Sequence, residues 1–380
     1  MSENKLPTAV AAALEKVEVY FKDVIPWLAN MYDPETKGFY MTVSGKEDPN
    51  MAPAVEMTCW GLSFLNGYTD ALKNAPKEFL QGLIDFMYDR QDPETGLFID
   101  KQGPTNPRET ARNQAAGLGT LRMLGVPTKY PHPRNSESSS ASNNVVMPEY
   151  MATVDSYMAW VKAHNWDHGS WSAGDQTQSS LQYVTMLEPE QQEVYKAALF
   201  KWLGERQQES GLWSPDFDFN SASGAFKVGL VYAHFGMRLP NPDKIVDAIF
   251  HCYKVSKTTS PFFVRNPISV LAQMASYSDE LRDKIRRLIV ENIDAVTESF
   301  GEFLCPDGAF SARKEKSMYS FGGVVGSHEL FEGDIDATLM MLIARKQLYL
   351  IFGVPAPYLN TDDFWDWISG KKPMPKLGKA

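Results

Sequence analysis

Two stretches of this chain, QDPETGLF at residues 91–98 and QQESGLW at residues 207–213, share one form. In each, an amphipathic segment ends in a glutamine, which is followed by a polar turn, a glycine and, two positions later, an aromatic residue. Weaker copies of this Gly-aromatic turn are DPETKGFY at residues 33–40, DHGSW at 167–171 and PDGAF at 306–310. Five copies over most of the chain indicate an internal repeat, which constrains the fold before any site is considered.

Apolar residues recur at helical spacing along nearly the whole chain, whereas the alternation typical of strands is scarce. This spacing predicts helices over residues 5–31, 54–69, 77–90, 108–124, 148–163, 176–187, 189–208, 222–236, 242–256, 266–277, 279–298 and 334–352. Prolines that suit a first helical turn are Pro107, Pro148, Pro189 and Pro242. Asp279 is placed to cap its helix.

The loops between these segments alternate in character. One kind is short, such as Glu188 and Pro189, and the other is longer and holds the Gly-aromatic turns. This alternation predicts an all-α fold in which helical hairpins form an (α/α)6 toroid of inner and outer helices, with seven hairpins as the alternative. The predicted inner segments WGLSFLNGY and ATLMMLIA are poor in charge, as covered helices should be. The glycine would permit the turn, and the aromatic ring would seal the hairpin against its neighbour.

The length and composition fit one large domain, so we expect residues 1–380 to form a single toroid. Residues 128–147, TKYPHPRNSESSSASNNVVM, are rich in proline and serine and predict a flexible insertion on the face opposite the long loops. We expect a C-terminal tail from about residue 353.

Charge and cysteine usage exclude several classes of function. The net charge is −10 and there is no run of lysine or arginine, so we expect no nucleic-acid partner. The N-terminus lacks an uninterrupted apolar segment, so we expect neither a signal peptide nor a membrane contact. We therefore expect a cytoplasmic protein, or a secreted one if the sequence is truncated. The three cysteines are far apart, which predicts buried free thiols, and we expect no cofactor. The sequence makes no prediction of oligomeric state.

The candidate site follows from the predicted ring. If the long loops share one face, the N-terminal ends of the inner helices meet there, and their free N–H groups favour an anion. The polar residues at these ends are Glu56, Arg108, Glu109, Arg112, Asn113, Gln114, Asp175, Gln176, Gln178, Lys227, Arg265, Asn266, His328, Glu329, Glu332, Asp334 and Asp336. Arginines and amides in a concave mouth suit the carboxylate of a sugar acid. The alternative is that Arg108 and Arg112 form structural ion pairs with Glu109 or Glu329.

The turn QQESGLW resembles the Q-x-x-x-G-x-W repeat of terpene cyclases. The wider pattern resembles the α/α toroid that terpene cyclases share with protein prenyltransferases and several polysaccharide lyases. The stretch GAFKVGLVYAHFGMRLPNPDKIVDAIFHC, followed by VRNP, is most similar to the small single-domain lyases of glucuronan and alginate. No diagnostic motif accompanies this resemblance, and HNWDHGSW has the residue types of the Asn-His motif of such lyases without its order.

The resemblance implies an enzyme that cleaves an acidic oligosaccharide or polysaccharide by β-elimination. That reaction needs a group that neutralises the substrate carboxylate, a base, and an acid for the leaving oxygen. The predicted catalytic residues are Tyr319, His328, Asn113 and Arg112, of which Tyr319 and His328 lie in the glycine-rich stretch KSMYSFGGVVGSHELFEGD. The predicted substrate-binding residues are Arg108, Lys227, Arg265, Asn266, Gln176, Trp171 and Trp213.

Two other classes stay open. The stretch EGDIDATLMML is similar to the D-x-D-D acid motif of class II terpene cyclases, but Ala337 stands where the proton donor should be. A helix cap at Asp334 explains the stretch as well. A non-catalytic sugar-binding toroid would use tryptophan rings as stacking surfaces, with candidates Trp60, Trp166, Trp171 and Trp213.

Acidic residues before the last predicted helix raise the question of a metal. Glu329, Glu332, Asp334 and Asp336 offer oxygen ligands that suit a hard cation. Carboxylates in the first turn of a helix explain the same spacing, because they interact favourably with the helix dipole. We therefore predict no metal site.

Overall fold

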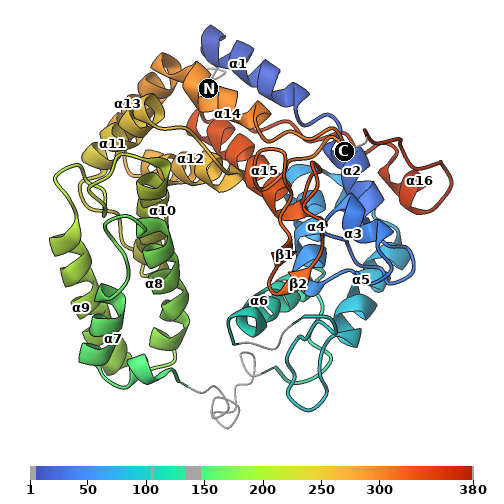
Figure 1. Cartoon of the computed structure of the whole chain (residues 1–380), viewed down its shortest axis with the longest axis horizontal. Helices are drawn as coiled ribbons and strands as arrows, with labels where there is room; N and C mark the ends of the chain where they lie inside the picture. The colour runs from blue at the N-terminus through green and yellow to red at the C-terminus, as the bar shows by residue number, and fades with distance from the viewer. Residues whose placement is uncertain (1–5, 104–106, 133–146, 379–380) are drawn as a thin grey trace. The chain divides into compact units, whose positions relative to one another are not determined.

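The computed structural model describes residues 6–103, 107–132 and 147–378, with residues 107–111 described by their backbone alone. An all-α fold of many packed helices is confirmed (Figure 1). The α-helices are α1 (Thr8–Val19), α2 (Val24–Met31), α3 (Val43–Glu47), α4 (Val55–Tyr68), α5 (Lys77–Asp89), α6 (Pro107–Met123), α7 (Val154–Lys162), α8 (Ser170–Val184), α9 (Pro189–Arg206), α10 (Phe219–His234), α11 (Pro242–Val255), α12 (Pro261–Ala275), α13 (Asp279–Glu291), α14 (Ile293–Gly301), α15 (Ile335–Ile351) and α16 (Phe364–Ile368).

Short elements complete the secondary structure. Two 3-10 turns, η1 (Ala71–Asn74) and η3 (Glu149–Met151), lie in connections between helices. Strands β1 (Ser320–Phe321) and β2 (Val324–Val325) pair antiparallel and form the one two-stranded sheet found in the described ranges. No described helix has both the length and the apolar character required to cross a membrane.

Each predicted helix has a counterpart, but several ends and breaks differ from the prediction. The segment predicted over 5–31 is divided into α1 and α2, and the segment over 279–298 is divided into α13 and α14. Helix α8 begins at Ser170 instead of residue 176, and α12 begins at Pro261 instead of residue 266. The prediction that Asp279 caps its helix was wrong, because Ser278 accepts the hydrogen bond from Leu281 N at 3.2 Å.

The chain folds into two compact units, which are described separately. Unit 1 comprises Met1–Ala13, Val145–Ser299 and Ile343–Pro355, and unit 2 comprises Leu14–Asn144, Phe300–Leu342 and Ala356–Ala380. The ring of hairpins and the single domain concern the whole chain and stay predictions.

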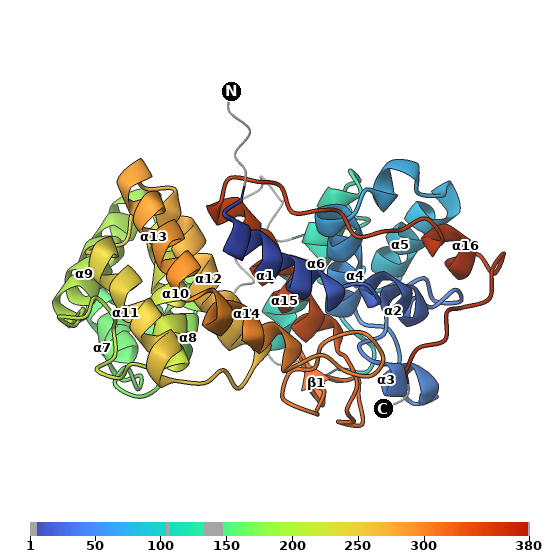
Figure 2. The same cartoon turned by 90° about the horizontal axis from the view of Figure 1, so that it is seen from above.

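Unit 1 is built around α10, which packs against α8 and α12 (Figure 2). Glycines permit this close approach. A Cβ added at Gly224 would lie 2.3 Å from Ser170 Oγ, and one added at Gly229 would lie 2.7 Å from Gln273 Oε1. A larger residue at Gly224 would also meet the Ser170 backbone and would force α10 away from α8, whereas one at Gly229 would displace the flexible end of the Gln273 side chain.

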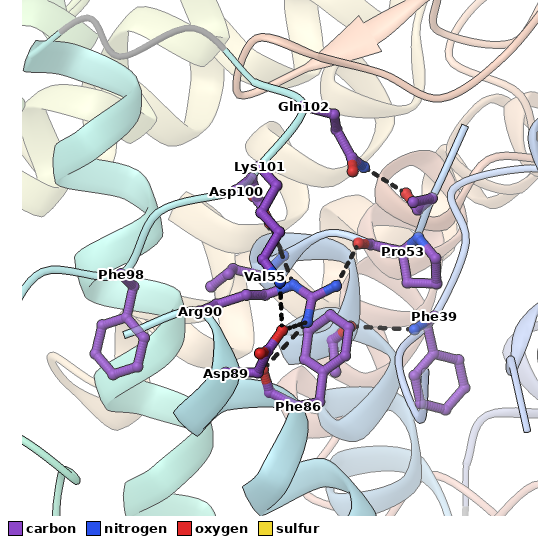
Figure 3. A network of polar contacts seen from close by, with 12 residues as sticks. Phe39, Pro53, Val55, Phe86, Asp89, Arg90, Phe98, Asp100, Lys101 and Gln102 are labelled. Atoms are coloured by element: carbon purple, nitrogen blue, oxygen red, sulfur yellow. Dashed lines mark hydrogen bonds and ion pairs between the residues drawn. The ribbon is translucent and has the colours of Figure 1, made fainter. Parts of the chain in front are cut away.

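Unit 2 contains an apolar cluster where α4, α5 and α6 meet, made of Val55, Phe86, Met87, Phe98, Ala116 and Leu121. A polar network beside it fixes the start of α4 (Figure 3). The Arg90 guanidinium lies 3.4 Å from the Phe86 ring centre and 3.7 Å from Asp100. The Asp100 carboxylate in turn accepts Val55 N at 3.0 Å, so it satisfies an N–H group at the first turn of α4.

The predicted insertion and tail have different outcomes. Residues 133–146 of the insertion lie outside the described residues. The segment after residue 353 contains α16, and the side chain of Phe364 is buried. The neighbouring Trp365 packs edge-on against Phe79 with ring centres 4.9 Å apart, so this part of the predicted tail is joined to unit 2.

The Gly-aromatic turns form tight hairpins between helices. In the second turn Asp92 N donates to Leu97 O at 2.9 Å, and the aromatic Phe98 is fully buried. Gly96, Gly211 and Gly308 have left-handed backbone angles, with φ of 69°, 88° and 90°. The glycine in these three turns is therefore required by the backbone conformation.

Two of the weaker copies depart from this geometry. In the turn at residues 33–40 the left-handed residue is Lys37, with φ of 70°. Its neighbour Gly38 is needed for space instead, because an added Cβ would lie 2.3 Å from the Phe86 ring. In DHGSW, Gly169 precedes α8 with φ of −138° and Trp171 lies inside the helix.

The glutamine of the two strongest copies fastens each turn to a later loop. Gln91 Nε2 donates to Gly96 O at 2.8 Å and to Tyr130 O at 3.0 Å. Gln207 Nε2 makes the equivalent bonds, to Gly211 O at 2.8 Å and Pro240 O at 3.0 Å. The repeated sequence thus encodes a repeated hydrogen-bond pattern between neighbouring connections.

We expect Gln207→Ala to lower the free energy of unfolding by about 1 to 3 kcal/mol, because the carbonyl groups of Gly211 and Pro240 lose their donor. Gln81→Ala is the matched control, since Gln81 is exposed on α5 and bonds to Asp85 on the same helix, and it should cost less than about 0.5 kcal/mol. Urea denaturation measures both. Equal losses in the two variants would contradict a structural role for the repeated glutamine.

Candidate functional site

The predicted site residues belong to both compact units, and each group is described by itself. Those in unit 2 are Arg112, Asn113, Tyr319 and His328. Those in unit 1 are Trp171, Gln176, Trp213, Lys227, Arg265 and Asn266. The side chain of Arg108 lies outside the described residues.

In unit 2, Arg112 forms a two-pronged ion pair with Glu56. Arg112 Nε donates to Glu56 Oε2 at 3.1 Å, and Nη2 donates to Oε1 at 2.7 Å. The sequence suggested Glu109 or Glu329 as structural partners. Glu329 instead contacts Lys316 at 3.0 Å, and the side chain of Glu109 lies outside the described residues.

Aromatic side chains and the β1–β2 hairpin surround this ion pair. The Arg112 Cζ atom lies 4.2 Å from the ring centre of Phe321, which contacts Trp60 at 4.7 Å. Gly322 has a left-handed φ of 56°, and an added Cβ would lie 3.0 Å from Glu56 Oε2. The glycine therefore lets the hairpin approach the carboxylate. We call Glu56, Trp60, Arg112 and Phe321 the carboxylate–guanidinium site.

This site combines burial with partial access. The Glu56 side chain is 11% exposed and that of Arg112 is 34% exposed. Burial raises the pKa of Glu56 above its usual value, although Arg112 lowers it in part. A carboxyl group shifted in this direction is better matched to proton transfer near neutral pH.

Asp334 has a structural role in the same unit. Its Oδ1 accepts Ala337 N at 2.8 Å, while Oδ2 accepts Ala312 N at 2.8 Å and Met318 N at 3.2 Å. The side chain is fully buried. Asp334 thus caps α15 and fastens two loop segments, which confirms the helix-cap interpretation of this residue.

Two other buried carboxylates are also engaged by the fold. Asp307 Oδ2 accepts Trp27 Nε1 at 3.0 Å and Gly333 N at 2.9 Å. Glu332 Oε2 accepts Ser44 N at 2.8 Å. Glu56 differs from these groups, because within the described part of the chain its carboxylate accepts hydrogen bonds from the Arg112 side chain alone.

The described residues contain no group of three or more His, Cys, Asp and Glu side chains arranged to hold a metal ion. Cys252 and Cys305 are buried free thiols, as predicted, and Cys59 is a half-buried one. Burial raises the pKa of each thiol, which makes them weak nucleophiles.

Tyr319 and His328 lie on either side of the hairpin. Tyr319 is 52% exposed, and its carbonyl accepts Gly326 N at 3.1 Å. His328 Nε2 lies 3.0 Å from Asp48 Oδ2. The pKa of Asp48 is lowered, chiefly by the backbone N–H of Asn50 and further by His328. Tyr319 thus offers an accessible hydroxyl, whereas the imidazole already has a carboxylate partner.

Asn113 has a structural explanation. Its side chain is buried and hydrogen-bonds Asp100, the residue that binds the first turn of α4. This contact accounts for Asn113 without a ligand.

In unit 1, cationic and aromatic residues gather on α8, α10 and α12. Lys227 Nζ lies 2.6 Å from Asp175 Oδ1 and 5.7 Å from the ring centre of Phe226. Arg265 Cζ lies 4.2 Å from the same ring, and Arg265 Nη1 donates to Asn266 Oδ1 at 3.0 Å. Two predicted binding cations therefore share one aromatic neighbour.

The remaining predicted residues of unit 1 have unlike surroundings. The ring of Trp171 lies 5.7 Å from that of Phe262 and is half-buried. Gln176 is exposed, with one long contact of 3.5 Å to Ser172 Oγ. Trp213 is fully buried and donates its indole N–H to Leu203 O at 2.8 Å. Its surroundings explain Trp213 by packing and leave no face for a sugar ring. We call Trp171, Lys227, Arg265 and Asn266 the donor cluster.

Sequence reasoning missed several functional candidates. Glu56 and Trp60 were considered separately, although their spacing of four places them on one face of α4. Asp48 and Asp175 were not assigned as partners of His328 and Lys227, because such contacts join separate segments. Phe321 left no signal apart from its glycine neighbours.

Comparison with protein-family models, curated proteins and solved structures found no match to this chain. The function is therefore inferred from the geometry of the two groups of residues.

We expect Asp334 to make stability depend on pH. Burial raises its pKa to about 6, whereas an unfolded aspartate titrates near pH ~3.9. The folded protein therefore binds the proton more tightly, and the free energy of unfolding falls as the pH rises from about 4 to about 6, by on the order of 2 to 3 kcal/mol.

Denaturation midpoints measured from pH 4 to pH 7 test this slope. Asp334→Asn should reduce it, although the variant is also less stable because its side chain has one acceptor oxygen where the carboxylate has two. Asp362→Asn, at an exposed position in the same unit, should keep the slope of the unmodified protein. The same slope in Asp334→Asn would show that other groups cause it.

Proposed function

We propose that the protein is a lyase that cleaves a uronic-acid-containing glycan, of the glucuronan or alginate type, by β-elimination. The observation that carries the proposal is the ion pair of Glu56 and Arg112 beside a glycine-rich aromatic hairpin. It brings a poorly hydrated carboxylate, an accessible cation and aromatic surface together in one unit.

The reaction assigns a role to each group. Glu56 removes the proton from the carbon beside the substrate carboxylate. The next carbon of the ring carries the glycosidic oxygen, and the bond between this carbon and that oxygen breaks. A double bond forms between the two ring carbons. Arg112 stabilises the charge that develops on the substrate carboxylate. A guanidinium has about five N–H donors, and Glu56 engages Nε and one Nη2 donor, so further donors remain for the substrate.

The leaving oxygen requires a proton. Tyr319 is the preferred donor, because its side chain is 52% exposed and lies in the hairpin segment that contacts the ion pair. His328 is the second choice, since Asp48 already binds its imidazole. The terpene-cyclase alternative is less well supported, because Asp334 is engaged by backbone N–H groups and residue 337 is alanine.

Elimination is measured directly, because the new conjugated double bond absorbs ultraviolet light. We expect activity on glucuronan or alginate and a decrease of at least about a hundredfold in turnover for Glu56→Gln, which keeps the shape but removes the base. Glu78→Gln is the control at an exposed position of α5 and should leave turnover unchanged. A glycan that binds but is never eliminated by the unmodified protein would favour the non-catalytic sugar-binding alternative.

The pH profile tests Arg112. Because its charge lowers the pKa of Glu56, Arg112→Met should raise that pKa further. The base must be ionised, so activity rises with pH through this pKa, and the acidic limb of kcat should move to higher pH. An unchanged limb, in a variant whose thermal melting shows it to be folded, would assign the limb to a group other than Glu56.

Tyr319→Phe removes a hydroxyl and no charge. We expect turnover to fall at least about a hundredfold with the acidic limb of the pH profile unmoved and KM nearly unchanged. His328→Gln is measured beside it. A normal rate for Tyr319→Phe together with a slow His328→Gln would transfer the acid role to His328.

A further inference from the structure

The β1–β2 hairpin has a tight turn that determines where the Phe321 ring lies. Phe321 and Val324 are paired across the two strands, so their side chains project from the same face of the hairpin. The turn between them consists of Gly322 and Gly323 alone, whose φ angles of 56° and 79° are both left-handed. Two-residue turns of this kind match the twist of a hairpin and favour glycine. The stretch SFGGVV at residues 320–325 thus sets the register of the hairpin and the face from which the ring projects.

The side chains on this face contact α4, α6 and the segment between α5 and α6. The Arg112 Cζ atom of α6 lies over the Phe321 ring, 4.2 Å from its centre, and the Trp60 ring of α4 meets the same ring edge-on at 4.7 Å. Val324 is buried, and one of its methyl groups would lie 3.1 Å from a Cβ added at Gly103. Both members of the cross-strand pair are therefore packed against unit 2, and Phe321 is the member that contacts the cation.

The Arg112 guanidinium has few other restraints. Its side chain is 34% exposed, and its polar and ring contacts with described residues are the two hydrogen bonds to Glu56 and the Phe321 ring. An arginine side chain has several rotatable bonds and loses conformational freedom when it is held in one position. The hydrogen bonds hold one edge of the guanidinium, and a ring over its face restricts the plane in which that edge can turn. Phe321 thus limits a movement that the hydrogen bonds leave open.

The same contact determines which part of the guanidinium stays open to a ligand. Glu56 accepts from Nε and Nη2, and the Phe321 ring lies over a face of the group. The remaining N–H donors belong to the edge formed by Nη1 and Nη2, and such an edge suits the two oxygens of a carboxylate. A carboxylate bound there would lie in the plane of the guanidinium, next to Glu56.

We propose that Phe321 is a positioning residue, which holds the Arg112 guanidinium in one plane against the Glu56 carboxylate and leaves its Nη1–Nη2 edge free for the carboxylate of the substrate. The catalytic part of this role rests on the proposed lyase function. The action of Phe321 on Glu56 through Arg112 does not, and it is measured without a substrate.

The titration of Glu56 reports how closely Arg112 is held, because a cation beside a carboxyl group lowers its pKa. The other groups that interact electrostatically with Glu56 are Asp100 and Cys59, and the variants below leave both unchanged. The NMR signal of the Glu56 carboxyl carbon is followed in the full chain between about pH 3 and about pH 9. Its loss in Glu56→Gln assigns the signal.

Phe321→Met removes the ring and keeps a long apolar side chain. We expect the midpoint of the Glu56 titration to rise by about half a pH unit, because a guanidinium that is less restrained lowers the pKa less. Phe321→Tyr keeps the ring and should keep the midpoint of the unmodified protein. If thermal melting shows that Phe321→Met is unfolded, Phe321→Leu takes its place.

Tyr358→Leu is the matched control, because it removes an aromatic ring that lies beside another cation of the same unit. The Tyr358 ring is 5.8 Å from Lys73 Nζ, and its side chain is 62% exposed. This variant should leave the midpoint of the Glu56 titration unchanged. An equal rise in Tyr358→Leu and Phe321→Met would overturn the positioning role.

A second background separates positioning from the exclusion of water. If Phe321 acts through Arg112, Phe321→Met should not raise the midpoint further in a protein that already carries Arg112→Met. If the ring only keeps water from Glu56, its removal lowers the midpoint, and by the same amount in both backgrounds. A fall or no change in the single variant, or an equal change in both backgrounds, would contradict the proposal.

Turnover of the uronan tests the catalytic part. Phe321→Met should lower kcat about two- to fivefold and move the acidic limb of its pH profile with the Glu56 midpoint, and Phe321→Tyr should restore both. Equal turnover by the Phe321→Met and unmodified proteins would overturn this part. The two proposals fail separately. A raised midpoint in Phe321→Met without ultraviolet-detected elimination by the unmodified protein would overturn the lyase function and leave the coupling in place. Elimination with a Glu56 midpoint that does not respond to Phe321→Met would do the reverse.

Discussion

The start of a buried helix needs acceptors for its backbone N–H groups, and the structure of unit 2 depends on how this need is met. Asp100 serves α4 by accepting Val55 N at 3.0 Å, and Asp334 serves α15 by accepting Ala337 N at 2.8 Å. Both carboxylates are buried, so replacing them would leave N–H groups that water cannot reach. Arg90 and Asn113 then hold Asp100 in place. The start of α4 therefore depends on residues of two neighbouring segments, the end of α5 and α6.

The same constraint acts in three of the Gly-aromatic turns. The N–H group of the buried aromatic residue donates there to a side chain of a later helix, α4, α6 or α15: Phe39 N to Thr58 Oγ1 at 3.1 Å, Phe98 N to Gln114 Oε1 at 2.6 Å and Phe310 N to Thr338 Oγ1 at 3.1 Å. The turn and this later helix are thus joined by a hydrogen bond as well as by the buried ring. The two interactions fix different degrees of freedom, the position of the ring and the direction of the chain.

Most of the helices could be predicted from the sequence, because the spacing of apolar residues indicates which helix faces are buried. The long periodic segments became helices, and Pro189 and Pro242 mark helix starts as expected. Ends were harder where polar residues lie within a helix. Helix α8 begins with SWSAGDQT, which has no apolar period, so Ser170 gave no signal of a helix start.

The site was less predictable for a different reason. Arg112 was identified from its residue type and position, but its partner Glu56 lies 56 residues away, and spacing carries no information about such a pairing. The surroundings of a side chain also cannot be predicted from its residue type. Trp171 and Trp213 have the same side chain, yet Trp213 donates its indole N–H to Leu203 O, while that of Trp171 has no acceptor in the described part of the chain.

Three other buried carboxylates of unit 2 show what distinguishes Glu56. Asp307, Glu332 and Asp334 are committed to backbone N–H groups, and moving any of them would dismantle a loop or a helix start. Among the described residues, Glu56 accepts hydrogen bonds only from the Arg112 side chain, which is 34% exposed. Glu56 can therefore change its protonation state or its partner without breaking a backbone hydrogen bond. A proton-transfer group must do both in every catalytic cycle. Burial therefore raises the pKa of a carboxyl group. Only a carboxylate that binds no backbone N–H group can then gain and lose a proton without disturbing the fold.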